Sequence, residues 1–181
     1  MAMILLIGAS ASGKSEIAKA LASSFHINKA ITHTTRAKRE GEKQDVDYHF
    51  VSVETFLRLK EEGAFVETTF YNGNYYGCSK KEIAIDKAVV VDPQGLLNFL
   101  ATGEKSIVSF LLEASKETRL ARMSGRGDKK EAILSRIEND DIVFDRNNIA
   151  PCDFYLSTEN KSIEELAKEV YSLYQSKINS L

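Results

Sequence analysis

The segment from Gly8 to Ser15, Gly-Ala-Ser-Ala-Ser-Gly-Lys-Ser, constrains the fold of this chain more than any other part of it. It matches the pattern G-x-x-x-x-G-K-[ST] of a phosphate-binding loop. The apolar run at 3–7 before it suits a buried strand, and residues 15–21 after it have helical spacing. In a strand–loop–helix unit, backbone N–H groups and the positive end of the helix form an anion site. The segment therefore predicts a nucleotide-binding α/β protein.

Specific roles follow for the residues of this loop. Lys14 is predicted to reach the β- and γ-phosphates of ATP, and the Ser15 hydroxyl to ligate Mg²⁺. A water-mediated contact of Asp92 with the metal is left open. The residues predicted to bind ATP are Gly8, Ala9, Ser10, Ala11, Ser12, Gly13, Lys14 and Ser15. The alternative interpretation is a glycine-rich turn that only caps a helix.

Length and composition indicate an ordinary globular domain. A chain of 181 residues suits one domain with small inserted subdomains. A net charge of −2 offers no electrostatic basis for binding nucleic acid or an anionic membrane. Cys78 and Cys152 lack metal-ligand spacing, which favours a reducing compartment. Because the N-terminus enters the first strand directly and no apolar run would span a bilayer, we expect a cytoplasmic protein.

The segment from about 32 to 79 is predicted to be a small β-rich insert. Asn72-Gly73 is a strong hairpin signal, and Gly63 is expected to end a short helix. The predicted elements are a strand at 48–51, a helix at 53–62, a strand at 65–71 and its hairpin partner from 74 to 76.

Strands and helices alternate again after the insert. Pro93 is expected in the first turn of a helix that buries Leu96, Leu97 and Leu100, and Ser115 is expected to cap the next helix. The other predicted elements are strands at 88–91, 107–112 and 154–156 and helices at 131–144 and 163–178. The pattern predicts a doubly wound parallel sheet whose ligands lie beyond the carboxyl ends of the strands.

Four motifs mark the insert: Thr-His-Thr-Thr-Arg-Ala-Lys-Arg at 32–39, Asp-Tyr-His-Phe at 47–50, Phe-Val-Glu at 65–67 and Gly-Asn-Tyr-Tyr-Gly at 73–77. Together they resemble the guanylate kinase family, which phosphorylates GMP with ATP. The resemblance covers essentially the whole chain. It implies one domain, 1–181, with a P-loop kinase core at about 1–31, 80–124 and 145–181. The nucleoside monophosphate-binding insert would be about 32–79, and a helical lid about 125–144.

The acceptor phosphate is assigned to the insert. Arg36 and Arg39 lie three residues apart, and both can present planar donor forks to one phosphate. The resemblance implies that Tyr48 and Tyr76 donate their hydroxyl groups to the same phosphate. The alternative is that the arginines are solvated surface charges and that the tyrosines only pack the sheet.

Selection of guanine is assigned to Glu67, whose carboxylate would face the N1–H and N2–H₂ edge of the base. Adenine presents a lone pair and a C–H there, and it would leave the carboxylate unpaired. The resemblance implies that Thr32, Cys78 and Asp92 also contact GMP. Alternatively, Glu67 is a surface residue, Thr32 bonds its own backbone and Asp92 only caps a helix.

The expected lid supplies further positive charge. The resemblance implies that Arg122, Arg126 and Arg136 are catalytic and approach the phosphates when the lid closes. The alternative for Arg122 and Arg136 is a helix-face ion pair, such as Arg136 with Asp140 four residues later.

The chain departs from the family pattern at several positions. Ala9 and Ala11 replace the usual proline and glycine of the loop, and Cys78 replaces threonine or serine. Val90 replaces an acidic residue, and 127–136 is one residue short. These departures bear on acceptor identity and turnover more than on the fold.

The leading hypothesis is ATP-dependent phosphorylation of GMP, and of dGMP, by in-line transfer with Mg²⁺ as the cofactor. Two alternatives stay open: a related kinase of another phosphorylated acceptor such as a ribose phosphate, and a non-catalytic binding module. ATP and GMP are the expected partners, nucleic acid and membranes are not, and the chain is expected to be a monomer or a homodimer.

Overall fold

Parallel strands form the central sheet of the computed structural model, which describes residues 3–83, 86–104, 106–127 and 130–180. Their order is β2-β7-β1-β8-β9, and every neighbouring pair is parallel. The bounds are Met3–Ile7 for β1, Asn28–Lys29 for β2, Lys87–Val90 for β7, Ile107–Glu113 for β8 and Phe154–Ser157 for β9. The predicted doubly wound sheet is confirmed.

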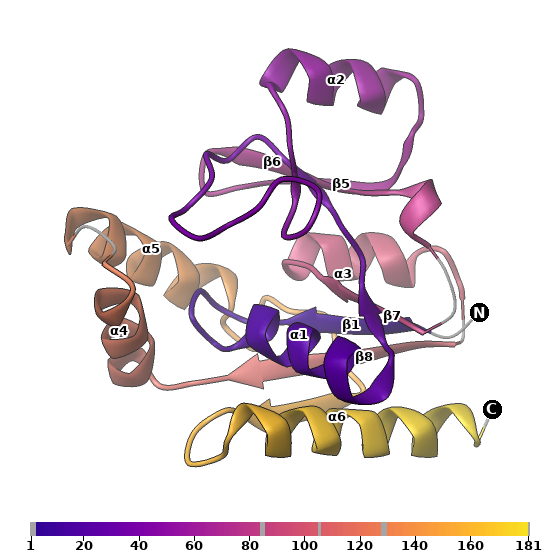
Figure 1. Cartoon of the computed structure of the whole chain (residues 1–181), viewed down its shortest axis with the longest axis vertical. Helices are drawn as coiled ribbons and strands as arrows, with labels where there is room; N and C mark the ends of the chain where they lie inside the picture. Colours follow the sequence, from indigo (N-terminus) through magenta and orange to yellow (C-terminus); the bar gives the residue numbers. More distant parts are fainter. Residues whose placement is uncertain (1–2, 84–85, 105, 128–129, 181) are drawn as a thin grey trace.

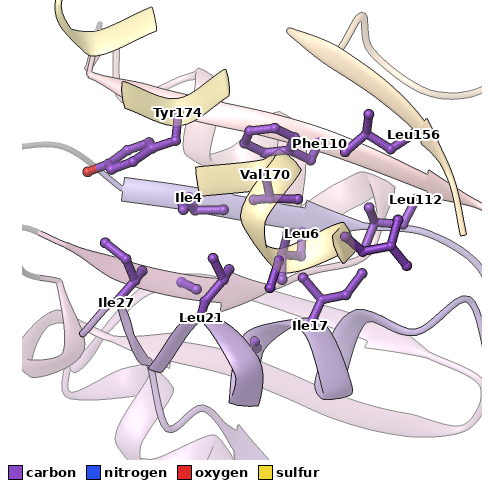
Figure 2. Packing of buried hydrophobic residues seen from close by; sticks show 14 of the residues in the cluster. Ile4, Leu6, Ile17, Leu21, Ile27, Phe110, Leu112, Leu156, Val170 and Tyr174 are labelled. Atoms are coloured by element: carbon purple, nitrogen blue, oxygen red, sulfur yellow. The ribbon is translucent and has the colours of Figure 1, made fainter. Parts of the chain in front are cut away.

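Helices cover both faces of this sheet (Figure 1). α1 (Lys14–Phe25) and α6 (Ile163–Ile178) pack on one face, and α3 (Pro93–Leu100) packs on the other. Figure 2 shows the side chains of α1 and α6 gathered around Ile4 and Leu6 of β1. The alternate residues of β1 face α3. Burial on both faces explains why the strands read as continuous apolar runs.

A second sheet, from the insert, stands above the core in Figure 1. Its order is β4-β3-β6-β5. The bounds are His33–Thr34 for β3, His49–Phe50 for β4, Phe65–Tyr71 for β5 and Asn74–Ser79 for β6, with α2 at Val53–Glu61 and a 3-10 turn, η1, at Lys80–Glu82. Asn72 and Gly73 have φ values of 48° and 73°, so both adopt the left-handed conformation that a two-residue hairpin turn requires. The predicted hairpin is confirmed.

Two helices pack together beside the phosphate-binding loop. They are α4 (Lys116–Gly125) and α5 (Lys130–Val143). Ser115 caps α4 by accepting the Thr118 N–H at 3.2 Å, as predicted. Met123, Ile133 and Ile137 form a small buried cluster between the helices. Residues 128–129 of the expected lid lie outside the described residues.

The prediction for α3 is wrong at two positions. Leu96 is buried, but Leu97 and Leu100 are 45% and 41% exposed, and Phe99 takes the inward position with 1% exposure. Residues three apart share a helix face, so 96 and 99 point to the sheet while 97 and 100 point away.

Within the described ranges, no helix has the length and apolar character that crossing a membrane requires.

Candidate functional site

The loop from Gly8 to Ser15 joins β1 to α1, as its motif predicts. Gly8 has a φ of 152°, and a Cβ atom there would lie 2.3 Å from the Leu112 carbonyl oxygen and 2.6 Å from Ser12 Oγ. Only glycine fits that position. Ser12 Oγ is buried and has no hydrogen-bond partner among the described residues. The backbone of the loop therefore forms a tight turn that leaves a polar atom unsatisfied beneath it.

Lys14 is folded back onto this loop. Its Nζ donates to the carbonyl oxygens of Gly8 at 2.5 Å and Ala9 at 2.8 Å. Burial lowers the pKa of Lys14 to about 8, although the nearby Asp140 carboxylate opposes the shift. The negative charge of a phosphate bound in the loop would stabilise this ammonium group in its charged form.

The loop and the insert open onto one cleft of about 180 Å³. It lies beyond the carboxyl ends of the parallel strands, as expected for this architecture. The predicted site residues that line it are Gly8, Ser10, Ala11, Gly13, Lys14, Ser15, Thr32, Arg36, Arg39, Tyr48, Glu67, Tyr76, Asp92 and Arg126. The structure thus brings most of the predicted site together.

The paired arginines of the insert are held by one carboxylate. Arg36 Nη2 donates to Glu42 Oε1 at 2.8 Å, and the Arg39 backbone N–H donates to Glu42 Oε2 at 2.7 Å. Arg39 Nε is buried without a hydrogen-bond partner among the described residues. Burial and then the charges of Arg36, Arg136 and Arg126 lower the pKa of Arg39. This concentration of positive charge would be relieved by an anion.

Two tyrosines lie beside these arginines. The rings of Tyr48 and Tyr76 are 6.3 Å apart, and the Arg36 guanidinium lies 5.5 Å from the centre of the Tyr48 ring. Burial, followed by Tyr76, raises the pKa of Tyr48 to about 12. The Tyr48 hydroxyl therefore keeps its proton at neutral pH and can donate it in a hydrogen bond.

Glu67 is a buried carboxyl group in the wall of the cleft, 7% exposed. Its Oε1 accepts the Cys78 backbone N–H at 3.0 Å, while Oε2 is buried and has no hydrogen-bond partner within the described ranges. Burial and then Asp92 raise the pKa of Glu67 to about 8. A ligand that brings two adjacent N–H donors would satisfy this group.

Two predicted residues point elsewhere. The Cys78 side chain is fully buried in the core cluster next to α3, and the residue reaches Glu67 only through its backbone N–H. Arg122 donates to the carbonyl oxygens of Ala11 at 3.0 Å and Thr158 at 2.8 Å. Its charge therefore lies against the backbone of the loop rather than in the lining of the cleft.

The remaining predicted residues have mixed positions. Ala9 supplies a carbonyl oxygen to Lys14, and Arg136 lies on α5 within electrostatic range of Arg39. Asp92 both lines the cleft and caps α3, because its Oδ1 accepts the Gly95 N–H at 2.8 Å. Asp92 therefore caps α3 and lines the cleft at the same time.

Oxygen donors suited to Mg²⁺ are present at the loop. Ser15 and Asp92 both line the cleft. The described residues contain no group of three or more His, Cys, Asp or Glu side chains that could hold a metal ion alone. Mg²⁺ at phosphates usually takes one or two protein oxygens and completes its shell with phosphate and water. The residues present fit that mode of binding.

Sequence analysis predicted no functional role for Tyr71, and it considered Asp140 only as an alternative ion-pair partner of Arg136. Tyr71 lines the cleft from the hairpin, and Asp140 is a carboxylate with 1% exposure that accepts the Ser10 N–H at 2.7 Å. Asp140 lies three residues after the buried Ile137 on α5, so it falls on the inward face of that helix. A charged residue at an inward helical position is the signal that could have identified it.

Comparisons with known proteins relate this chain to one family. The sequence model of the family described as guanylate kinase matches residues 1–177. A guanylate kinase from Schizosaccharomyces pombe is 34% identical over 179 residues, covering 94% of this chain and 88% of that protein. One from Anaplasma phagocytophilum is 32% identical over 181 residues, covering 94% and 84%. The crystal structure of guanylate kinase from Anaplasma phagocytophilum superimposes with a TM-score of 0.69 at 28% identity, covering 97% of this chain and 85% of that one.

Proposed function

This chain belongs to the guanylate kinase family and is an enzyme that phosphorylates GMP with ATP, and we propose that transfer proceeds in line within the cleft and that dGMP is also an acceptor. The proposed acceptor contacts involve the base and the phosphate, so they do not require the 2′-hydroxyl group. We assign acceptor binding to about 32–79 and the lid to about 125–144.

On the donor side, the amides of the loop and Lys14 hold the β- and γ-phosphates of ATP. The Ser15 hydroxyl would hold Mg²⁺, Asp92 would contact it through water, and the ion would supply charge that neutralises the phosphates. Lys14 exchanges its carbonyl partners for phosphate oxygens, which restores the charge that burial disfavours. Arg122 stabilises the loop by donating a hydrogen bond to the Ala11 carbonyl oxygen.

On the acceptor side, Arg36 and Arg39 bind the phosphate of GMP as planar donor forks. Tyr48 and Tyr76 add hydroxyl donors to the same phosphate. Arg126 and Arg136 bring further positive charge from the lid side, where phosphoryl transfer spreads negative charge. Closure of the lid would exclude water and so prevent hydrolysis of ATP.

The observation that carries the choice of GMP is the buried Oε2 of Glu67, which none of the described residues hydrogen-bonds. The N1–H and N2–H₂ groups of guanine supply adjacent donors that a sugar phosphate lacks. Cys78 orients this carboxylate through its backbone N–H, and Thr32 and Asp92 complete the wall around the base. Adenine would leave the carboxylate unsatisfied, which can discriminate by about 10⁴-fold.

A coupled assay of ADP release tests this proposal with GMP, dGMP, AMP, CMP, UMP and ribose 5-phosphate as acceptors. Turnover with GMP and dGMP far above that with the others is the expected result. Faster turnover with ribose 5-phosphate would identify the alternative kinase. Binding of GMP without turnover of any acceptor would identify a binding module instead.

A further inference from the structure

Asp140 on α5 is a buried carboxylate that accepts three hydrogen bonds from the part of the chain that the structure describes. It accepts the Ser10 backbone N–H at 2.7 Å, the Tyr71 hydroxyl, and Arg119 Nη1 at 3.4 Å. With 1% exposure, the side chain is almost wholly removed from water. A buried charge persists only where its partners compensate for lost hydration, so the three donors account for its presence.

The three donors come from parts of the chain that are far apart in sequence. Ser10 lies in the phosphate-binding loop, Tyr71 lies at the end of β5 in the insert, and Arg119 lies on α4. The Tyr71 ring also packs edge-on against Phe144, at 6.2 Å between ring centres. One carboxylate therefore joins the loop, the acceptor-binding sheet and the pair of helices beside them.

We propose that Asp140 is a positioning residue for phosphoryl transfer. Its hydrogen bonds connect the loop, the Tyr71 hairpin and α4, and they hold these segments so that both phosphate-binding surfaces face one cleft. This inference rests on the proposed function, because it concerns alignment of the two substrates. Asp140 acts through Ser10 and Tyr71 and needs no contact with substrate. Misplacement of reacting groups by about 1 Å can cost about 100-fold in rate, so such a tie has a large effect on turnover.

The charge of Asp140 also acts on Lys14. Arg39 from the insert and Arg126 and Arg119 from the lid side all lower the pKa of Lys14, after burial, whereas Asp140 is the group that raises it. Asp140 therefore places a negative charge among several positive charges beside the loop.

The test compares Asp140→Asn and Tyr71→Phe with the matched control Asp141→Asn. Asp141 is the next residue on α5 and is exposed. It accepts Arg119 Nη2 at 2.7 Å and Lys116 Nζ at 3.0 Å, and both of these donors lie on α4. We expect Asp140→Asn and Tyr71→Phe to lower kcat about tenfold or more, with GMP affinity by calorimetry within about threefold of wild type. Asp141→Asn should match wild type.

Each result decides a separate claim. Wild-type protein without GMP kinase activity would refute the proposed function itself. An active wild type with Asp140→Asn indistinguishable from Asp141→Asn would refute the positioning role. If Asp140→Asn fails to fold, Tyr71→Phe still tests the inference, since it removes one hydroxyl and keeps the ring. Unchanged kcat in Tyr71→Phe would then overturn it.

Discussion

At the scale of single residues, Lys14 has the most direct link between environment and chemistry. Its ammonium group is buried and bonded to two carbonyl oxygens of its own loop, partners that phosphate oxygens would replace. We expect Lys14→Met to lower kcat by about 10²-fold or more, because a preorganised charge at the transferring phosphate is lost. Steady-state kinetics measures the loss, and calorimetry should show GMP affinity within about twofold of wild type.

Lys19→Met provides the control for this substitution. Lys19 lies one turn further along α1, is exposed, and pairs at the surface with Glu16 at 3.2 Å. Its removal should leave turnover unchanged, since exposed ion pairs contribute little. Retention of wild-type kcat in Lys14→Met would show that the loop does not hold the donor.

Glu67 makes GMP binding depend on pH. Burial followed by Asp92 raises the pKa of Glu67 to about 8, so the free protein carries this group largely protonated at neutral pH. The donors of guanine require the carboxylate, and GMP binding must therefore release a proton. We expect GMP affinity to rise several-fold between about pH 7 and about pH 8.5, measured by calorimetry. In Glu67→Gln this pH dependence should vanish, and a wild-type affinity that falls with pH would contradict the assignment.

The phosphate-binding loop and most residues that line the cleft could be predicted from the sequence, because their expected roles depend on the chemistry of the side chains. Sequence analysis misplaced the Cys78 side chain, since the register of β5 against β6, with its irregularity between Phe65 and Glu67, decides which groups face the cleft. It also did not predict the hydrogen bonds of Asp140, whose donors are 21 to 130 residues away in the chain. Such long-range partners leave no local pattern in the sequence.

At the scale of helices and strands, agreement follows the strength of the local pattern. The predicted bounds of β5 and α6 match the structure, because alternation with a hairpin turn marks the first and a long amphipathic period marks the second. β2, β3 and β4 have two residues each, and pairing with distant strands defines them. Strand formation of that kind depends on context more than on intrinsic propensity.

Gly77 shows how closely α2 packs on the insert sheet. A Cβ atom at this position would lie 3.0 Å from Phe56 Cζ and 3.1 Å from Phe65 Cδ1, and these two rings are stacked with centres 4.7 Å apart. We expect Gly77→Ala to destabilise the protein by about 1–3 kcal/mol through overpacking. Scanning calorimetry should show a melting temperature roughly 2–10 °C lower.

Gly125→Ala is the matched control for this prediction. Gly125 ends α4, and an added Cβ atom would meet no heavy atom of the other described residues within 4 Å, apart from its chain neighbours and the backbone of its own helix. Alanine favours helix over glycine by about 1 kcal/mol in helix interiors, so its melting temperature should equal or slightly exceed that of wild type. Equal stability of the two variants would show that the rings beneath Gly77 yield to the extra methyl group.

At the scale of the whole molecule, the cleft is assembled from segments that the chain supplies separately. The loop follows β1, the guanidinium groups of Arg36 and Arg39 come from the insert, and Arg126 follows α4. Their positive charges converge while the pKa of Arg39 is lowered by burial, Arg36, Arg136 and Arg126. In the substrate-free protein these positively charged side chains therefore repel one another, and an anionic ligand would relieve this repulsion.

This repulsion predicts that the phosphate of GMP stabilises the protein as a whole. At about 100 times its Kd, a ligand that binds only the folded state adds about 2.7 kcal/mol, which is roughly 5–10 °C in melting temperature for a chain of this size. Guanosine at the same concentration should give a much smaller rise, because it lacks the phosphate. Arg39→Gln should remove most of the difference between the two ligands, as measured by scanning calorimetry. If guanosine stabilised wild type as much as GMP does, the convergence of guanidinium groups would not be a phosphate site, and binding would depend on the Glu67 side of the cleft alone.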